Sequence, residues 1–293
     1  MKNSLKLQLI SSAILILICS CASFEPGWNN LASKTSNKDV TVLTEKANKL
    51  EMISATSDEI KLLIDAYSEI EKVDPNNYYG LWKIGHYHIL MGAAHSTKTK
   101  DKKFHYREAI KYFEKAMYTN ADFAQDITEG KEVFEACEQL TIKEIDAMGF
   151  WYTARFYYFK ECLNPIGKVF NTDIVLENNK AIEYIDKLDP NWYGGGNYFS
   201  KALFYIATPT KFGGSKAKAK DEFLAAIEAG PTFIVNRWGR AKYLYSLTGD
   251  LEGFKSDMRW VIEQDPNREG NPYPWNIYFQ NDAKNELRKV NSN

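Results

Sequence analysis

The chain has 293 residues, of which 44% are hydrophobic, 14% aromatic and 26% charged, with 37 basic against 38 acidic side chains. This length permits one large domain or two ordinary ones, and the composition excludes a disordered, collagen-like or polytopic membrane protein. The net charge of −1 offers no basis for holding nucleic acid through its phosphates, so we expect no nucleic-acid partner.

Residues 1–20 have the pattern of an export signal. Lys2 and Lys6 precede an apolar stretch over residues 7–18, which is too short and wrongly flanked to be a membrane-spanning helix. We therefore predict that residues 1–20 form a signal peptide. Because acidic side chains outnumber basic ones in the remaining chain, the composition implies no basic membrane patch.

Two cysteines near this signal distinguish ordinary secretion from lipidation. Cys21 follows the small residue Ser20, whereas Cys19 follows the bulky Ile18, and the run resembles a bacterial lipobox. The resemblance implies diacylglyceryl attachment at Cys21 and a periplasmic protein anchored by lipid to a bacterial membrane, with the outer membrane preferred. The alternative is a plain signal peptide that is cleaved elsewhere.

The next segment, residues 22–40, is rich in Ser, Asn and Lys and shows no hydrophobic periodicity. It predicts a flexible tether. The lipid-anchored tether then covers residues 21–40, and a single helical-repeat domain covers residues 41–293.

Internal repetition is the main feature of this domain. Ala219, Phe223, Ala226 and Pro231 follow the A-x3-F-x2-A-x4-P spacing of a tetratricopeptide repeat. Residues three and four apart share one helix face, and a small residue there lets the next helix approach closely. The spacing recurs, in part or in full, at three other places: Leu63, Tyr67, Ile70 and Pro75; Ala109, Phe113 and Ala116, with Ala121 in place of Pro; and Phe254, Met258, Val261 and Pro266. The repeat-like units are expected to end near residues 75, 121, 190, 231 and 266.

Aromatic-rich segments supply the first helix of each pair, expected over residues 81–92, 150–159, 195–206 and 235–247. The charged segment 281–290 predicts a solvated capping helix. We therefore predict an all-α fold: an α-solenoid of irregular tetratricopeptide-like helix pairs, closed or superhelical, with a C-terminal capping helix.

Glycine runs predict two turns in the C-terminal half. Gly194–Gly196 predicts a turn that opens a helix. Gly213 and Gly214 predict a tight turn, with Ser215 as the N-cap of a helix that begins at Lys216.

Cys137 and Cys162 are the other cysteines of the chain. A helical hairpin that turned between Asp146 and Gly149 would set them opposite each other. Packed helix axes lie 8–10 Å apart, whereas bonded cysteines need Cα atoms closer than about 7 Å. The sequence leaves a disulfide and two buried free thiols as alternatives.

Seven aromatic residues lie within residues 150–159, too many for one face of a helix. Tyr and Trp combine a broad apolar face with one polar group, which suits the lining of a ligand cavity. We therefore predict an apolar channel lined by Trp151, Phe156, Trp192, Tyr193, Tyr198, Phe199 and Tyr205. The alternative is that all these rings belong to the core between repeats.

Catalytic, metal and cofactor sites are not indicated by the sequence. His86 and His88 lie two residues apart, which on a helix turns their side chains about 200° away from each other. No metalloprotease, nucleotide-binding or nucleophile-elbow motif occurs. We expect no enzymatic activity, no metal and no cofactor.

The stretch from about Ala147 to Pro266 resembles a known family. It contains FWYTARFYYFKE, then LDPNWYGGGNYFSKALFYIATPTKFGGSKAKAKDEFLAAI, and it closes with DLEGFKSDMRWVIEQDP. This order of turns and helices is similar to the T-component (TatT) family of TRAP-transporter-associated periplasmic lipoproteins. Two departures are Asn197-Tyr198-Phe199, where Arg often follows the glycines, and Ser215, where an acidic residue is usual.

The resemblance implies an accessory component that binds or relays a small, partly apolar organic solute together with a periplasmic solute-binding protein, the P-component. The second hypothesis is a helical-repeat scaffold that binds peptide segments in envelope assembly. A homo-oligomer is left open by the sequence.

Overall fold

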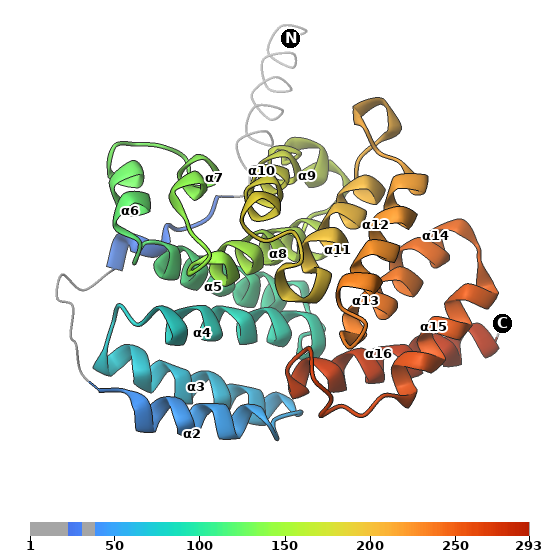
Figure 1. Ribbon diagram of the computed structural model, residues 1–293, viewed down its shortest axis with the longest axis horizontal. Helices are drawn as coiled ribbons and strands as arrows, with labels where there is room; N and C mark the ends of the chain where they lie inside the picture. Colours follow the sequence, from blue (N-terminus) through green and yellow to red (C-terminus); the bar gives the residue numbers. More distant parts are fainter. Residues whose placement is uncertain (1–22, 31–38, 293) are drawn as a thin grey trace, which may run out of the picture.

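The computed structural model describes residues 23–30 and 39–292, and the regular secondary structure of these residues is helical (Figure 1). Within these ranges no β-strand occurs, which confirms the predicted all-α fold class. The signal peptide predicted over residues 1–20, with Cys19, and the proposed lipidation site Cys21 lie outside the described residues.

In chain order, the first helices are η1 (Gly27–Asn30), α2 (Thr41–Glu51), α3 (Ser57–Val73), α4 (Tyr78–Leu90), η2 (Met91–His95), α5 (Thr99–Met117), α6 (Ala121–Thr128), α7 (Val133–Ala136) and η3 (Cys137–Gln139). The helices after these are α8 (Ile145–Cys162), α9 (Pro165–Phe170), α10 (Asp173–Leu188), α11 (Trp192–Ala207), η4 (Thr210–Phe212), α12 (Lys216–Ala229), α13 (Ile234–Gly239), η5 (Arg240–Tyr245), α14 (Ser246–Thr248), α15 (Leu251–Glu263) and α16 (Tyr273–Asn291). Of the η elements, η2 and η5 are π-helical and the other three are 3-10 turns.

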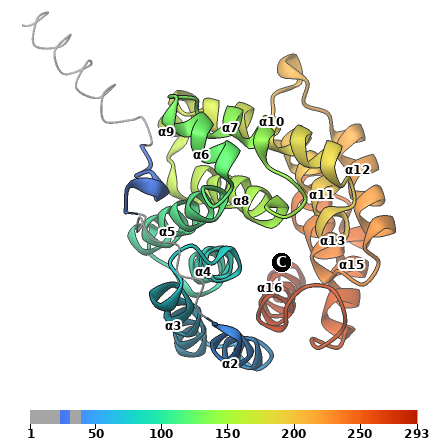
Figure 2. The same cartoon turned by 60° about the vertical axis from the view of Figure 1, so that its left-hand side comes forward.

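Helices that follow one another along the chain also pack against one another. Contacts run from α2 through α3, α4, α5 and α8 to α10, and from there through α11, α12, α13 and α15 to α16. Figure 2 shows that this array curves, so that α16 returns to the side of α4. The rings of His86 on α4 and Trp275 on α16 stack with their centroids 5.2 Å apart. The curved array therefore surrounds an interior to which distant parts of the chain contribute.

The residues predicted to pack between repeat units are buried in the structure. Six of them have no exposed surface: Ala109, Phe113 and Ala116 on α5, and Ala219, Phe223 and Ala226 on α12. Facing glycines permit the close approach, because a Cβ on Gly85 of α4 would lie 2.8 Å from the ring of Phe113. A Cβ on Gly195 of α11 would lie 2.5 Å from the carbonyl oxygen of Ala226. Small residues thus bring α4 close to α5, and α11 close to α12.

Both glycine turns are present as predicted. The backbone at Gly194 and Gly195 is left-handed, with φ of 59° and 87°, and the regular part of α11 follows. The Ser215 side chain accepts a hydrogen bond from the backbone N–H of Lys218 at 3.2 Å and caps α12.

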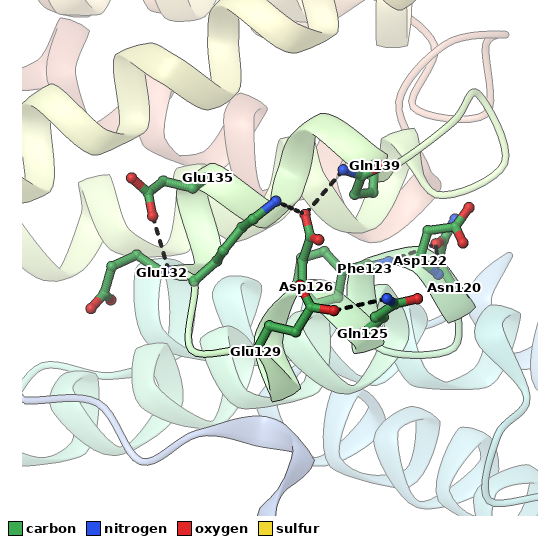
Figure 3. A network of polar contacts seen from close by, with 10 residues as sticks. Asn120, Asp122, Phe123, Gln125, Asp126, Glu129, Glu132, Glu135 and Gln139 are labelled. Carbon is green, nitrogen blue, oxygen red and sulfur yellow. Dashed lines mark hydrogen bonds and ion pairs between the residues drawn. The ribbon is translucent and has the colours of Figure 1, made fainter.

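Between α5 and α8 the chain carries short elements that the repeat spacing does not predict. Where Ala121 replaces the expected Pro, the chain continues into α6, α7 and η3. Figure 3 shows the polar contacts of this segment, in which Asp126 accepts hydrogen bonds from Lys131 Nζ at 2.8 Å and from Gln139 Nε2 at 3.0 Å. The ring of Phe123 on α6 is fully buried. The segment is an insertion that is fastened both by its own polar contacts and by the core.

The C-terminal helix differs from the prediction. A solvated capping helix is predicted over residues 281–290, but α16 begins at Tyr273. Its first half carries the buried rings of Trp275 and Phe279, which face the interior of the array. Only the second half has the charged, solvated character that the sequence indicates.

In the described part of the chain, Cys137 and Cys162 are buried free thiols. The hairpin that would set them opposite each other does not form, because α8 runs without a break from Ile145 to Cys162. At 1.5 Å per residue, the two ends of α8 are roughly 25 Å apart, and Cys137 precedes its start.

Residues 23–30, which belong to the segment predicted as a flexible tether over residues 21–40, are docked on the helical body, where η1 packs against α5. The backbone N–H of Gly27 donates to the buried carboxylate of Glu114 at 2.9 Å. The ring of Trp28 stacks on Tyr118 with centroids 5.9 Å apart. A few aromatic residues dock this polar segment on α5. The prediction of a tether used the average composition of the segment, in which these residues carry little weight.

Candidate ligand-binding cavity

A cavity lies inside the curved array, between α4, α8, α10, α11, η5 and α16. Its volume is about 120 Å³. This is close to the roughly 150 Å³ of an apolar protein cavity known to hold benzene. Most of the side chains that line the cavity are aromatic or aliphatic. The complete set of lining residues is His86, Phe150, Tyr152, Thr153, Phe156, Tyr157, Phe159, Ile174, Val175, Asn178, Ile182, Trp192, Tyr193, Gly196, Phe199, Ser200, Leu203, Phe204, Ala207, Val235, Trp238, Tyr243, Asn271, Trp275 and Phe279.

Helix α8 supplies one wall because it is apolar around most of its circumference. Phe150 and Phe156 face the cavity. Trp151, one residue further and turned by about 100°, faces α5 and donates its Nε1–H to Glu114 Oε1 at 3.1 Å. The helix is therefore shared between the core and the cavity.

The turn that opens α11 supplies the opposite wall. Tyr193 has φ of 52°, an uncommon left-handed conformation for a residue with a side chain. Its ring meets that of Phe150 edge to face, with centroids 4.9 Å apart. Asn236 holds this turn, since its side-chain amide donates to the carbonyl oxygens of Gly194 at 2.9 Å and Ala226 at 2.8 Å. The structure thus fixes Tyr193 in a strained conformation that places its ring at the cavity.

Trp192 is held in place by a glycine opposite its ring and by a half-buried acid. A Cβ on Gly149 would lie 2.1 Å from the Trp192 ring, so only glycine leaves room for the indole. The Trp192 Nε1–H donates to Asp146 Oδ1 at 2.9 Å. Burial raises the pKa of Asp146, and the hydrogen bond from Trp192 and the charge of Lys83 oppose this shift.

Four of the seven residues predicted to line a channel line this cavity: Phe156, Trp192, Tyr193 and Phe199. The other three do not. Trp151 is fully buried on the far side of α8. Tyr198 and Tyr205 lie half-buried on α11, with the ammonium groups of Lys201 and Lys218 each 5.3 Å from their rings. These three positions of the predicted channel lining therefore lie outside this cavity.

Several lining residues were missed by the sequence prediction, among them His86, Asn178 and Trp275. Asn178 could have been found, because it interrupts an otherwise apolar stripe of α10 that includes Ile174 and Ile182. His86 stood out only as a candidate metal ligand. Trp275 gives no local signal, since its position follows from the closure of the array.

Unpaired polar atoms gather at this cavity. Five buried side-chain atoms that line it have no hydrogen bond to the described residues: His86 Nδ1, Tyr152 Oη, Asn178 Oδ1, Tyr193 Oη and Trp275 Nε1. Ser200 lies near the hydroxyl of Tyr152, and Asn271 lies near that of Tyr193. A buried donor or acceptor without a partner costs about 1–3 kcal/mol. These atoms can pair with water or with the polar groups of a bound molecule.

The cavity wall is electrically neutral. Burial lowers the pKa of His86 well below its ordinary value, and the charge of Lys83 lowers it further, so the imidazole is uncharged. Burial raises the pKa of both Tyr152 and Tyr193, which keeps their hydroxyls protonated. Among the described residues, no Asp, Glu, Lys or Arg lines the cavity. The wall offers hydrogen bonds and apolar contact rather than charge.

The described part of the chain holds neither a metal cluster nor a membrane span. Residues 23–30 and 39–292 contain no group of three or more His, Cys, Asp or Glu side chains that could hold a metal ion. Within the same ranges no helix combines the length and apolar character needed to cross a membrane.

Comparison with known proteins identifies the family. The family model described as the TRAP transporter T-component matches residues 91–292, which include every cavity wall except His86 on α4. A search of curated proteins gave no match. A model that covers this much of the sequence shows membership, and the chain therefore belongs to the TRAP transporter T-component family.

Proposed function

We propose that this T-component binds a small, partly apolar organic solute in the interior cavity and relays it to or from the solute-binding protein of a TRAP transport system. It acts in the periplasm and is held to a bacterial membrane, preferentially the outer one, by lipid on Cys21. The observation that carries the proposal is the group of unpaired polar atoms around one aromatic cavity.

The wall defines the chemistry of the solute. The indole N–H of Trp275 and the hydroxyls of Tyr152 and Tyr193 can donate to a carbonyl, carboxyl or hydroxyl oxygen. Asn178 Oδ1 can accept from a hydroxyl or amine of the solute, and His86 Nδ1 serves in either role according to its tautomer. The surrounding rings contact the apolar part. Because no cation lines the wall among the described residues, binding relies on shape and neutral hydrogen bonds.

The mechanism is passive binding and release. Among the described residues, the wall offers no nucleophile hydrogen-bonded to a base, and the family is that of a transport component. The alternative hypothesis, a scaffold for peptide segments, calls for an open groove along the solenoid. The small volume of the cavity between α4, α8, α11 and α16, about 120 Å³, supports a small solute instead.

Two tryptophans allow a crossed test by native mass spectrometry and thermal melting. Trp275→Phe removes an N–H that has no partner among the described residues and keeps most of the ring. We expect the folded protein to melt nearly like wild type, while retention of a copurifying small molecule weakens about 3- to 10-fold, the value of one neutral hydrogen bond.

Trp151→Phe is the matched control. It removes an N–H that is bonded to Glu114 and that lies outside the cavity. We expect a loss of about 1–3 kcal/mol of stability, because the buried Glu114 oxygen loses its donor, with retention of the small molecule unchanged. Equal retention by both variants and wild type would refute a solute-binding role for this cavity, and the scaffold hypothesis would replace it.

A further inference from the structure

A second hollow lies on the outer surface of α5, on the side where the N-terminal segment is docked. It has a volume of about 690 Å³ and is lined by basic side chains together with Phe104. Lys100, Lys103, Arg107 and Lys111 stand three, four and four residues apart, so they share one face of the helix. We refer to this hollow as the α5 basic groove.

The cations of this groove are only partly neutralised. The acids that line it are Glu25 and Glu108. Lys111 Nζ lies 3.9 Å from Glu25 Oε2, a distant and partly exposed pair. Arg107 donates to the hydroxyl of Tyr158 at 3.3 Å, which leaves its charge uncompensated. Lys100 and Lys103 form no ion pair with any described residue. The groove therefore keeps an excess of positive charge that the overall charge of −1 hides.

The chain itself restricts how far this groove can lie from the lipid anchor. Glu25, which lines the groove, stands four residues after Cys21. Four residues span at most about 14 Å even when fully extended. The inference rests on the lipid anchor at Cys21 that the proposed function includes. An acylated Cys21 lies at the membrane interface, so the groove lies within reach of the headgroup layer.

The N-terminal segment is also prevented from swinging away from α5. Its Gly27 N–H is bonded to Glu114, and the ring of Phe24 meets Tyr158 edge to face with centroids 5.1 Å apart. Figure 2 shows this segment lying beside α5. The docked segment, residues 23–30, and the groove thus lie on the same side of α5.

We propose that the α5 basic groove binds the anionic headgroups of the membrane that holds Cys21, and that this contact sets the orientation of the body on the membrane. Clustered Lys and Arg near an anionic surface are attracted to it within about a Debye length, roughly 8–10 Å at moderate salt. Phe104, 57% exposed between Lys103 and Arg107, suits the boundary between headgroups and acyl chains. The groove would then present the rest of the protein to its partner in one fixed pose.

The test uses the full acylated chain in vesicles. The substitution Asp101→Cys introduces a thiol at an exposed position of α5, and a fluorophore is attached to it. Cys137 and Cys162 are buried, so they do not compete for the label. Quenching by a lipid that carries a spin label on its headgroup is measured in phosphatidylcholine vesicles and in phosphatidylcholine–phosphatidylglycerol vesicles. We expect stronger quenching in the anionic vesicles, and we expect added salt to remove the difference.

Charge-reversal variants distinguish binding through this groove from a general attraction between the charge of the protein and the anionic lipid. The double variant Lys100→Glu, Lys103→Glu should lose the extra quenching in anionic vesicles. The control Lys216→Glu, Lys218→Glu, with the same change of charge on exposed residues of α12, should keep it. Circular dichroism checks that both variants are folded.

The possible failures are distinguishable. Quenching that is equal in the two lipid mixtures, or equally reduced in the two double variants, overturns the groove proposal while the anchor stands. A protein whose mass lacks acyl chains overturns both the anchor and the groove proposal. Neither result bears on the solute cavity, which the tryptophan variants test separately.

Discussion

Glu114 is a buried carboxyl whose protonation should control the stability of the folded chain. Its oxygens accept hydrogen bonds from the Gly27 N–H at 2.9 Å and from the Trp151 Nε1–H at 3.1 Å. Burial raises its pKa from an ordinary 4.5 to about 7, against the opposing influence of these two hydrogen bonds and of Arg155. The folded protein therefore binds this proton more tightly than the unfolded chain does.

The sign of the effect on stability follows from linkage. Below pH 4.5 the group is protonated in both states, and its contribution to stability is fully present. As the pH rises towards 7, the unfolded chain releases the proton first, so the free energy of unfolding falls by up to about 1.4 kcal/mol per pH unit. Over the whole window the loss amounts to roughly 3 kcal/mol.

Glu114→Gln replaces the carboxyl with a neutral group of the same size that cannot titrate. Urea unfolding, followed by circular dichroism at a series of pH values between 4 and 8, measures the difference from wild type. Between pH 4 and pH 8, we expect the difference in the free energy of unfolding between variant and wild type to change by about 3 kcal/mol in favour of the variant. The surface control Asp58→Asn, whose partner is the exposed Lys61, should stay within about 0.5 kcal/mol of wild type. Parallel pH profiles for wild type and Glu114→Gln would refute the reasoning.

Two further predictions concern the turn at the start of α11 and the lipid anchor. Gly195→Ala should destabilise the protein by more than the roughly 1–3 kcal/mol of a strained backbone, because its φ is 87° and the new Cβ would lie 2.5 Å from the Ala226 carbonyl oxygen. Gly213→Ala, with φ of 100° but no atom within 4 Å of the new Cβ, should cost only the backbone strain, and thermal melts compare the two. Labelling with a radioactive fatty acid should be lost in Cys21→Ala and kept in Cys19→Ala, and label on the Cys21 variant would contradict the anchor.

The helices and their close contacts could be predicted from the sequence because they depend on local spacing. The steps from Ala219 to Phe223 and Ala226 placed three residues on one buried face, as a helical period requires. The glycines at the start of α11 predicted a turn for the same kind of local reason, and their backbone is left-handed. Such signals concern residues that lie within a turn or two of one another.

The cavity could be predicted only in part. Helix α8 is apolar on nearly all sides, so periodicity cannot say which of Phe150 and Trp151 faces the core and which faces the cavity. His86 and Trp275 meet through the closure of the whole array, and no local pattern reports a contact between such distant residues. The docked Phe24 was likewise hidden within a segment whose composition resembles a tether.

The central claim is that the interior cavity holds a small solute, and filling the cavity tests it most directly. Ser200→Leu adds an apolar side chain at a lining position on α11, where filling unoccupied space should not lower the melting temperature. Native mass spectrometry of the two proteins, purified side by side, should show a small-molecule adduct on wild type that Ser200→Leu lacks. The same adduct on both proteins, with equal occupancy, would contradict the claim and place the solute elsewhere.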